Sequence, residues 1–310
     1  MDIFFLGTSA AVPSKQRSTS CIAVREGPDV VLLDCGEGSQ RRIMASPVSF
    51  MKVRAVLITH MHGDHVFGLP GLLQTMGLSE RREPLSVYGP AGISSFVEAN
   101  MLLTEGEGAE PPYPVEVVEL EGGEEFDVPG FRVRCFRTEH GVSSVGYVLR
   151  EPDSPGRLDH RRALELGVRD GPDMARLKAG EAVGGVRPED VTGPPRPGLS
   201  MAYTGDTRPC GSTVENVRGV DVLVHEATYM SAESRNAEEH NHSTAAEAAA
   251  VARDAGVGHL ILTHISHRYE DREAVAAEAR EVFPETYAAD DMEVFRVTRG
   301  GVRAEPLRRA

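Results

Sequence analysis

Short apolar runs alternate with turn residues through the first part of the chain. Runs of roughly four to eight apolar residues bounded by Gly, Asp and Ser are typical of buried strands. Such runs occur at DIFFLG, TSCIAV, VVLLDCGEG, AVLITH, LSVYGP, PVEVVEL, FRVRCFR and VGYVLR. Helical spacing of apolar residues appears over about 66–76 and at ISSFVEANMLL. Strands are therefore predicted to dominate as far as Arg150.

Strands and helices alternate in the last third of the chain. Strands are predicted at LSMAYTGDT, DVLVHEAT, HLILTHIS and MEVFRV, and helices at STAAEAAAVARDAG and REAVAAEAREVF. Two sheets packed face to face with helices outside satisfy both halves, because each element then buries its apolar face. We therefore expect an α/β (α+β) fold that forms a single domain over residues 1–310.

The segment 151–197 breaks this rhythm. It is rich in Gly, Pro and charge, and its one helical pattern is the short stretch HRRALELG. Between Gly156 and Arg187, seven basic residues oppose five acidic ones, so this part is about +2 in a chain of −14. A loop this long inside a compact domain is either functional or disordered. A mixed charge run of this kind is either a solvated face or a binding segment.

Composition limits the function classes. A formal net charge of −14 over 310 residues disfavours a protein that coats nucleic acid through its whole surface, although a local basic patch remains compatible with it. No window approaches the ~18 consecutive apolar residues of a membrane span, and the opening MDIFFLGTSAAVP lacks the basic region of a signal peptide. Four cysteines lie far apart without a CxxC pair, as expected of reduced thiols. We expect a cytoplasmic protein with no membrane partner.

A dense group of metal-ligand residues follows the predicted strand AVLI. It comprises His60, His62, Asp64 and His65. In an extended or turning segment, His60 and His62 project to one side and can share a cation, while Asp64 and His65 can hold a second. One segment cannot complete two metal sites, so further ligands must come from elsewhere in the chain.

Other candidate ligands each stand at or just beyond the end of an apolar strand. They are His140, Asp206, His225 and His264. Loops at one edge of packed sheets converge, so these side chains can meet the first group. Imidazole and carboxylate donors without a thiolate favour Zn²⁺, with Mn²⁺ or Fe²⁺ as alternatives. Two cations ~3.5–4 Å apart can activate a bridging water and clamp a phosphoryl oxygen, so the pattern predicts metal-assisted hydrolysis.

The pattern His60-x-His62-x-Asp64-His65, together with His140, Asp206 and His264, resembles the metallo-β-lactamase superfamily. Further motifs are similar to the ribonuclease Z (tRNase Z) family. These motifs are His225-Glu226-Ala227-Thr228 (HEAT), His242-Ser243-Thr244 (HST), Pro13-x-Lys15-x-Arg17 (PxKxRN), Leu33-Asp34-Cys35-Gly36-Glu37-Gly38, and the arm 151–197 with Gly171-Pro172 and Leu177-Lys178-Ala179-Gly180. The resemblance spans nearly the whole chain. It implies an αββα sandwich in which the segment 151–197 is an inserted, protruding exosite arm that binds tRNA.

The resemblance also implies a division of the metal ligands. One zinc would be held by His60, His62, His140 and Asp206, and the other by Asp64, His65, Asp206 and His264, so that Asp206 bridges them. Asp34 and His225 would support ligands from behind rather than bind metal, although a purely structural Asp34 is the alternative.

Catalytic roles follow from the same resemblance. Asp64 would orient or deprotonate the attacking water, His242 would protonate the leaving 3′ oxygen, and Glu226 would orient His242. On the residues alone, His242 could instead be a simple neighbour of the cap at Ser243-Thr244, which opens the following helix.

By the same resemblance the substrate is precursor tRNA, cut after the discriminator nucleotide to leave a tRNA 3′-hydroxyl and a trailer 5′-phosphate. Phosphate contacts are expected from Lys15, Arg17, Arg176, Lys178 and Arg268, although Arg268 could equally be a solvated arginine. Ser18 follows Arg17 where the family motif usually has Asn, which leaves open how CCA-bearing precursors are handled. A second, degenerate half is absent from the sequence, so the chain is similar to the short form, which implies a homodimer.

Two rival functions remain. The first keeps the fold but hydrolyses small esters, as a phosphodiesterase, thioesterase or lactonase; the HEAT and HST motifs and the long arm speak against it. The second is a noncatalytic RNA-binding or scaffold protein with structural zinc. Structural zinc sites are closed and rich in thiolates, so the thiolate-free ligand set with His242 beside it argues against that rival.

Overall fold

A computed structural model describes residues 1–105 and 112–307 of the chain. They form two compact units, one built from Met1–Arg150 with Leu199–Ala310 and the other from Glu151–Gly198. Each unit has an apolar core of its own. Both sheets belong to the larger unit.

Among the described residues, the first sheet has eight strands in the order β17-β16-β1-β3-β4-β5-β6-β7. They are β1 (Asp2–Gly7), β3 (Cys21–Glu26), β4 (Asp29–Leu33), β5 (Val53–Leu57), β6 (Leu85–Gly89), β7 (Val115–Glu119), β16 (Glu293–Thr298) and β17 (Gly301–Pro306). Pairing is antiparallel from β17 to β4 and parallel from β4 to β7. Because β4 and β5 are parallel neighbours, Asp34 and His60 leave the sheet at the same edge.

The second sheet has seven strands within the described ranges, in the order β15-β13-β12-β11-β10-β9-β8. They are β8 (Glu125–Val128), β9 (Phe131–Arg137), β10 (Val145–Arg150), β11 (Ser200–Tyr203), β12 (Val222–Glu226), β13 (His259–Thr263) and β15 (Thr286–Ala288). The strands β11, β12, β13 and β15 are parallel, so their carboxyl ends share one edge. The short strands β2 (Ser9–Ala10) and β14 (Ile265–Ser266) form a separate parallel pair.

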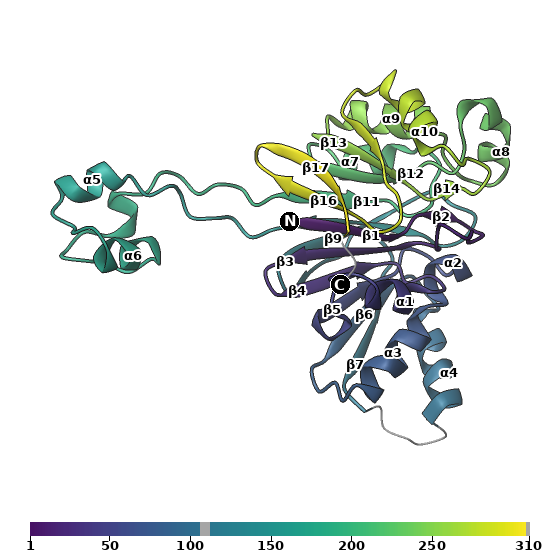
Figure 1. The fold of residues 1–310 in the computed structure, drawn as a ribbon, viewed down its shortest axis with the longest axis horizontal. Helices are drawn as coiled ribbons and strands as arrows, with labels where there is room; N and C mark the ends of the chain where they lie inside the picture. The colour runs from purple at the N-terminus through teal and green to yellow at the C-terminus, as the bar shows by residue number, and fades with distance from the viewer. Residues whose placement is uncertain (106–111, 308–310) are drawn as a thin grey trace. The chain divides into compact units, whose positions relative to one another are not determined.

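Helices cover the outer faces of both sheets (Figure 1). They are α1 (Ser39–Met44), α2 (Gly63–Val66), α3 (Leu69–Leu78), α4 (Ile93–Glu105), α7 (Gly211–Asn216), α8 (Ser234–Glu239), α9 (Ala245–Ala255) and α10 (Arg272–Arg280), with the 3-10 turns η1 (Phe50–Lys52) and η3 (Ser231–Glu233). Helices α1, α3 and α4 pack on the first sheet, and α9 and α10 pack on the second. None of the helices in the described ranges is long and apolar enough to cross a membrane.

Alternation along the strands produces three apolar layers. On β1, Ile3 and Phe5 face the core between the sheets, where the Phe5 ring meets Phe295 edge to face at 5.3 Å. Phe4, between them in sequence, faces the helical layer of the first sheet. Since the central strands of both sheets have two buried faces, as in β1, β4, β11 and β12, both halves of the chain need helices outside. The expected αββα sandwich is confirmed.

The structure differs from the predicted elements in two respects. The helix predicted over 66–76 is divided into α2 and α3 at Gly68, where a Cβ would lie 2.0 Å from the Gly36 carbonyl oxygen. The sequence pattern also missed α1, α7, α8, β8, β15 and β17. These elements are short, and β17 is largely exposed, so their apolar periodicity is too weak to detect.

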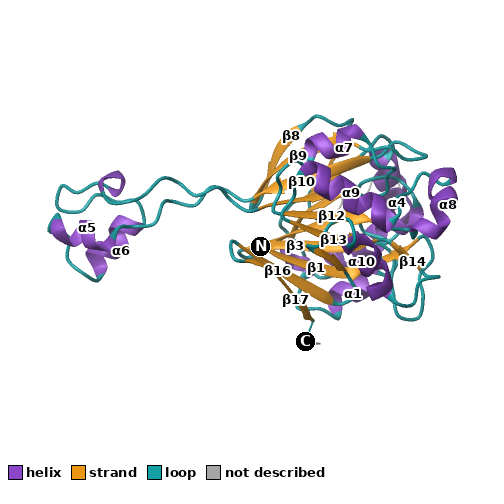
Figure 2. Ribbon diagram, turned by 90° about the horizontal axis from the view of Figure 1, so that it is seen from above, coloured by secondary structure: helices purple, strands orange, loops and turns teal. Residues whose placement is uncertain are grey.

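The smaller unit has more structure than its sequence suggested. It contains α5 (His160–Glu165), which overlaps the predicted helical stretch, and also α6 (Pro172–Lys178) and the 3-10 turn η2 (Pro188–Asp190); α5 and α6 are labelled in Figure 2. Its core is formed by Ala163, Val168, Met174, Leu177, Val183, Val186 and Val191. Pro172 at the start of α6 is a helix-start signal that the sequence reading overlooked.

Candidate metal centre

The segment from Thr59 to His65 carries four of the predicted ligands around the carboxyl end of β5. His60 is fully buried, whereas His62 is exposed and precedes α2. Asp64 and His65 lie within α2, in its single turn. The change from extended chain to helix therefore turns successive side chains toward one space at the edge of the first sheet.

Three further ligands reach this space from the second sheet. His140 follows β9, Asp206 follows β11 and His264 follows β13. The Arg208 backbone N–H donates to the Glu139 carbonyl at 2.7 Å, which ties the loop of His140 to the loop of Asp206. His264 has a left-handed φ of +51° where the chain passes from β13 into β14.

The structure brings together the first predicted trio, His60, His62 and His140. His62 Nδ1 lies 3.1 Å from His60 Nε2 and 3.3 Å from His140 Nε2. Their ligand atoms lie within 4.8 Å of one another. Three ring nitrogens that face one another so closely leave a space that suits a cation.

A second trio consists of Asp64, His65 and His264. Nε2 of His65 and Nε2 of His264 are 3.3 Å apart, and Asp64 Oδ2 lies 3.4 Å from the former and 3.3 Å from the latter. The Ala11 backbone N–H also donates to Asp64 Oδ2 at 2.9 Å. The backbone at Ala11 and the two histidine rings thus all contact the same oxygen of the Asp64 carboxylate.

Hydrogen bonds at Nδ1 leave the other nitrogen of several histidines free to bind a metal. His65 Nδ1 donates to Asp34 at 2.7 Å, and His140 Nδ1 donates to the Asn241 carbonyl at 2.9 Å. The Thr228 hydroxyl donates its one hydrogen to Glu226, so it accepts from His264 Nδ1 at 2.9 Å. In each ring the Nε2 lone pair is then directed into the cluster, as metal-binding histidines require.

Asp206 lies between the two trios. Its carboxylate is 3.7 Å from His60 Nε2, 3.5 Å from His65 Nε2 and 3.4 Å from His264 Nδ1. The side chain is almost fully buried, yet Oδ1 has no hydrogen-bond partner among the described residues. A buried carboxylate oxygen without a hydrogen-bond donor is costly unless a cation compensates its charge.

The electrostatics favour the metal-binding forms of His60, His62, Asp64 and Asp206, but not that of His65. Burial lowers the pKa of the His60 and His62 rings, which favours the neutral imidazole. Burial raises the pKa of Asp64 and Asp206, but the neighbouring histidines outweigh it and hold both pKa values below their usual range. His65 is buried too, yet Asp206 and Asp34 raise its pKa overall, so a cation bound there must displace a proton. The donor set and the fold together indicate a metal-binding site.

Asp34 supports the cluster from behind. Its fully buried carboxylate accepts hydrogen bonds from the Thr59 N–H at 2.7 Å, from the Tyr203 hydroxyl at 2.7 Å and from His65 Nδ1. It thereby fixes the start of the ligand segment and the ring of one ligand. Both the supporting role and a purely structural role of Asp34 are compatible with these contacts, so support of a metal ligand stays a prediction.

The buried carboxylate of Glu226 pairs with the partly exposed ring of His242 beside the cluster. His242 Nδ1 donates to Glu226 Oε1 at 2.8 Å, and the same oxygen accepts the Thr207 N–H at 2.9 Å. Burial of the His242 ring lowers its pKa, but the Glu226 carboxylate outweighs this and raises the pKa of His242 to about 9. His242 Nδ1 is 3.9 Å from the Asp206 carboxylate. His242 is therefore held close to the metal ligands in a form that can donate a proton.

Among the described residues, His225 belongs to none of the groups that could hold a cation. Its Nδ1 lies 2.8 Å from the carbonyl of Glu226, the next residue, and Nε2 has no partner among the described residues. Burial lowers the pKa of His225, so the ring is neutral. Its contacts thus differ from those of Asp34, with which it was grouped.

The predicted phosphate-binding residues are more dispersed. Lys15 is exposed, whereas Arg17 is buried and bonds the Tyr269 carbonyl at 3.3 Å. Arg268 pairs with Glu233 at 3.3 Å and lies 5.1 Å above the Tyr229 ring, although it is exposed. In the smaller unit, Arg176 pairs with Glu181 at 2.8 Å, and Lys178 is exposed.

Three groups at the site escaped the sequence reasoning. The Tyr203 hydroxyl bonds Asp34, and the Thr228 hydroxyl bonds both Glu226 and His264. The Ala11 amide bonds Asp64. Thr228 had a signal, because it is the last residue of the HEAT motif. Tyr203 and the Ala11 amide had none, since an ordinary strand tyrosine and a backbone N–H carry no motif.

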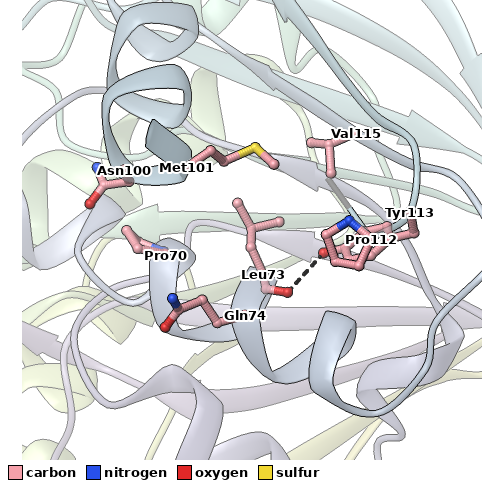
Figure 3. A pocket seen from close by; sticks show the side chains of 8 residues that line it. All are labelled: Pro70, Leu73, Gln74, Asn100, Met101, Pro112, Tyr113 and Val115. Atoms are coloured by element: carbon pink, nitrogen blue, oxygen red, sulfur yellow. Dashed lines mark hydrogen bonds between the residues drawn. The ribbon is translucent and has the colours of Figure 1, made fainter. Parts of the chain in front are cut away.

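An apolar pocket lies elsewhere on the larger unit, between α3, α4 and the chain that leads into β7 (Figure 3). The Tyr113 hydroxyl donates to the Leu73 carbonyl at 3.1 Å at its margin. Met101 and Val115 line it, and none of the predicted site residues does. The pocket is therefore separate from the metal cluster.

Comparisons with known proteins agree with this geometry. Residues 1–153 match the family model described as Anti-Pycsar protein Apyc1, and residues 183–265 match the one described as Beta-lactamase superfamily domain. The crystal structure of human tRNase Z, short form, has a TM-score of 0.71 and 28% sequence identity, and the match covers 96% of this chain and 100% of that one.

Full-length relatives narrow the family. Ribonuclease Z of Methanothermobacter thermautotrophicus is 42% identical over 298 residues, which cover 94% of this chain and 95% of that protein. Ribonuclease Z of Haloferax volcanii is 45% identical over 295 residues, which cover 93% of this chain and 92% of that protein. With this identity over nearly the whole length, and with the αββα fold around a His/Asp cluster, the chain belongs to the ribonuclease Z family.

Proposed function

We propose that this protein is a metal-dependent endoribonuclease that cleaves precursor tRNA after the discriminator nucleotide. The products are a tRNA with a 3′-hydroxyl and a trailer with a 5′-phosphate. The observation that carries this proposal is the Glu226–His242 pair beside the His/Asp cluster. A proton donor placed next to a cation site suits the release of a strongly basic alkoxide.

Zinc is the metal we propose, with two ions per subunit and Mn²⁺ as the alternative. One ion would be held by His60, His62, His140 and Asp206, and the other by Asp64, His65, Asp206 and His264. Imidazole and carboxylate donors without a thiolate support this choice. When bound there, the ions would supply Lewis-acid activation of water and neutralise charge on the phosphate.

Asp64 would orient the attacking water and accept its proton. Its carboxylate is anchored by the Ala11 amide and by the rings of His65 and His264, so its position is fixed before substrate arrives. The same neighbours hold its pKa low, which makes Asp64 a good orienting group and only a transient holder of the proton. The proton then passes to solvent.

His242 would protonate the leaving oxygen. Water forms the new bond to phosphorus, the bond between phosphorus and the 3′ oxygen breaks, and that oxygen takes a proton from His242. Glu226 binds Nδ1, so Nε2 is the nitrogen that can face the substrate. Glu226 also stabilises the protonated ring, which regains its proton from solvent after product leaves.

The remaining parts of the proposal concern substrate and assembly. The chain would be one catalytic domain, with residues 151–197 as an inserted arm that binds tRNA through Arg176 and Lys178, while Lys15, Arg17 and Arg268 would contact the acceptor end. Family membership also supports a homodimer that acts in the cytoplasm; sedimentation of the purified protein tests the oligomer.

A labelled precursor tRNA with a 3′ trailer tests this function. Wild type should cut after the discriminator, and His62→Ala should abolish cleavage. A third variant should lack residues 157–192, with Gly156 joined to Gly193, because the two glycines already touch: a Cβ on Gly156 would lie 1.8 Å from the Gly193 oxygen. That deletion should lose tRNA cleavage and keep hydrolysis of a small phosphodiester.

The rival function, a hydrolase of small esters with the same fold, makes the opposite prediction. Wild type would then ignore the precursor and hydrolyse small esters through the same ligands, and the deletion would change neither result. Such an outcome would reject the proposed substrate.

A further inference from the structure

Arg208 makes contacts that connect the loop of Asp206 to the chain segment that carries His242. Its Nη1 donates to the His242 carbonyl at 2.7 Å, and its Nη2 donates to Glu247 Oε1 at 2.9 Å. Its own backbone N–H bonds the Glu139 carbonyl, next to His140. Arg208 therefore connects the backbone of His242, through its side chain, to the loop of His140, through its own backbone.

Glu247 completes the connection at the first turn of α9. One of its oxygens accepts the Thr244 N–H at 2.8 Å, and the Thr244 hydroxyl accepts the Glu247 N–H at 3.2 Å. This capping box fixes the start of the helix. The side chains of Arg208 and Glu247 are only 22% and 32% exposed, which makes the ion pair stronger than an exposed one.

His242 precedes this helix and depends on these anchors. Its N–H donates to the Ala237 carbonyl at 2.8 Å, and Ser243 donates its hydroxyl to the Thr207 carbonyl at 2.6 Å. Arg208 holds the carbonyl between these two points. Without the guanidinium, the carbonyl of His242 would lose its charged donor, and the backbone of this segment would keep only the bonds to Ala237 and Thr207 beside the Nδ1 bond of the ring.

We propose that Arg208 is a positioning residue for His242. Through its bonds to the His242 carbonyl and to Glu247, Arg208 keeps the proton donor aligned with the leaving oxygen. The inference rests on the proposed function, because it assigns no new reaction. It adds a residue that touches neither substrate nor metal. A displacement of about 1 Å at a catalytic group can cost about 100-fold in rate.

Two substrates separate alignment of the proton donor from other defects. Precursor tRNA has a strongly basic alkoxide leaving group that needs a proton, whereas bis(4-nitrophenyl) phosphate has a weakly basic phenolate that does not. Loss of the donor should therefore slow the first reaction and spare the second. Loss of metal or of the fold should slow both.

The experiment measures kcat and KM on both substrates for wild type, Arg208→Ala, Glu247→Gln, His242→Ala and the double variant Arg208→Ala/His242→Ala. Arg54→Ala is the matched control, because the Arg54–Asp29 pair is 2.8 Å long and similarly shielded, at 23% and 25% exposed. It joins β4 to β5 near the amino ends of these strands, whereas the predicted ligands of this sheet follow the carboxyl end of β5. Metal content is measured for every variant.

We expect Arg208→Ala to lower kcat on precursor tRNA about 10- to 100-fold with KM and metal content unchanged. The rate on the phenolate substrate should stay within about twofold of wild type. In the His242→Ala background, Arg208→Ala should add no further loss. Arg54→Ala should match wild type on both substrates.

Two different failures can be told apart. If His242→Ala slows both substrates equally, the proton-donor assignment in the proposed function fails. If His242→Ala is selective for tRNA but Arg208→Ala slows both substrates, loses metal, or adds its loss to that of His242→Ala, the positioning role of Arg208 fails alone.

Discussion

At the scale of single residues, the site is built by pairs in which one side chain fixes another. Asp34 fixes His65, Thr228 fixes His264 and Glu226 fixes His242, and each support binds Nδ1. The supports lie on strands or directly after them, where the backbone is rigid. The orientation of the reactive nitrogens is therefore set by the fold before any ligand binds.

Asp34→Asn tests such a support. An amide can still accept from the Thr59 N–H, but it carries no charge to strengthen the bond from His65 Nδ1. Metal affinity should fall about 10- to 100-fold, as measured by competition with a chelator. Tyr203→Phe removes one neutral donor to Asp34 and should have a smaller effect. Equal affinity in Asp34→Asn and wild type would contradict the role.

At the scale of elements, close approach of backbones decides where α2 ends and α3 begins. Gly68 lies against the carbonyl of Gly36, which belongs to the turn after β4, and its N–H donates to the Cys35 carbonyl at 2.9 Å. The contact joins the α2–α3 junction to the turn that follows Asp34. Packing, not backbone angle, requires glycine here, because Gly68 has a φ of −80°.

Gly68→Ala should therefore destabilise the fold by about 1–3 kcal/mol, because the new methyl meets backbone that cannot move away easily. Gly71→Ala, inside α3, is the matched control. Its nearest neighbour would be the flexible Gln40 side chain at 3.4 Å, and alanine favours helix by about 1 kcal/mol. Urea unfolding measures both; an unchanged midpoint in Gly68→Ala would refute the packing argument.

Element by element, the sequence predicted what has strong local signals. Strands such as β1 and β13 and the helices α9 and α10 were found because their apolar periodicity is clear, and the ligand segment was found because its donors are contiguous. The break at Gly68 was missed, since it depends on a contact with Gly36 far away in sequence. Arg208 was missed for a related reason: it bonds a backbone carbonyl, which leaves no trace in residue spacing.

At the scale of the whole molecule, the His/Asp cluster joins loops from both sheets. The predicted metal ligands follow β5, β9, β11 and β13. A cation that binds all of them ties the two sheets together in the native state and has no comparable site in the unfolded chain. Binding should then stabilise the fold by mass action.

Chelation tests this coupling. Treatment with EDTA should lower the melting temperature of wild type by several degrees, which corresponds to roughly 2–4 kcal/mol for ions present at 100 to 1,000 times their Kd. His62→Ala/His140→Ala should show a smaller response, because one trio is lost. A melting temperature unaffected by chelation and by added zinc would contradict the coupling between metal binding and stability.

The smaller unit should contribute charge rather than chemistry. Lys178→Glu places a negative charge where we propose phosphate contact, so KM for precursor tRNA should rise several-fold. The slope of log affinity against log salt concentration should become about one unit less steep. Lys52→Glu makes the same charge change at another exposed lysine, in η1. Equal effects of the two changes would show that net charge alone, and not the arm, accounts for the result.

The smaller unit is inserted between two strands that are direct neighbours: Arg150 at the end of β10 pairs with Ser200 at the start of β11. A hairpin whose ends are already registered can exchange its connecting segment at little cost, because loop closure depends only weakly on length. If the smaller unit binds tRNA as we propose, selection can alter recognition at this junction while the reacting groups stay unchanged. Grafting the corresponding segment of a relative onto Arg150 and Leu199 should then change substrate preference and leave hydrolysis of a small phosphodiester unchanged.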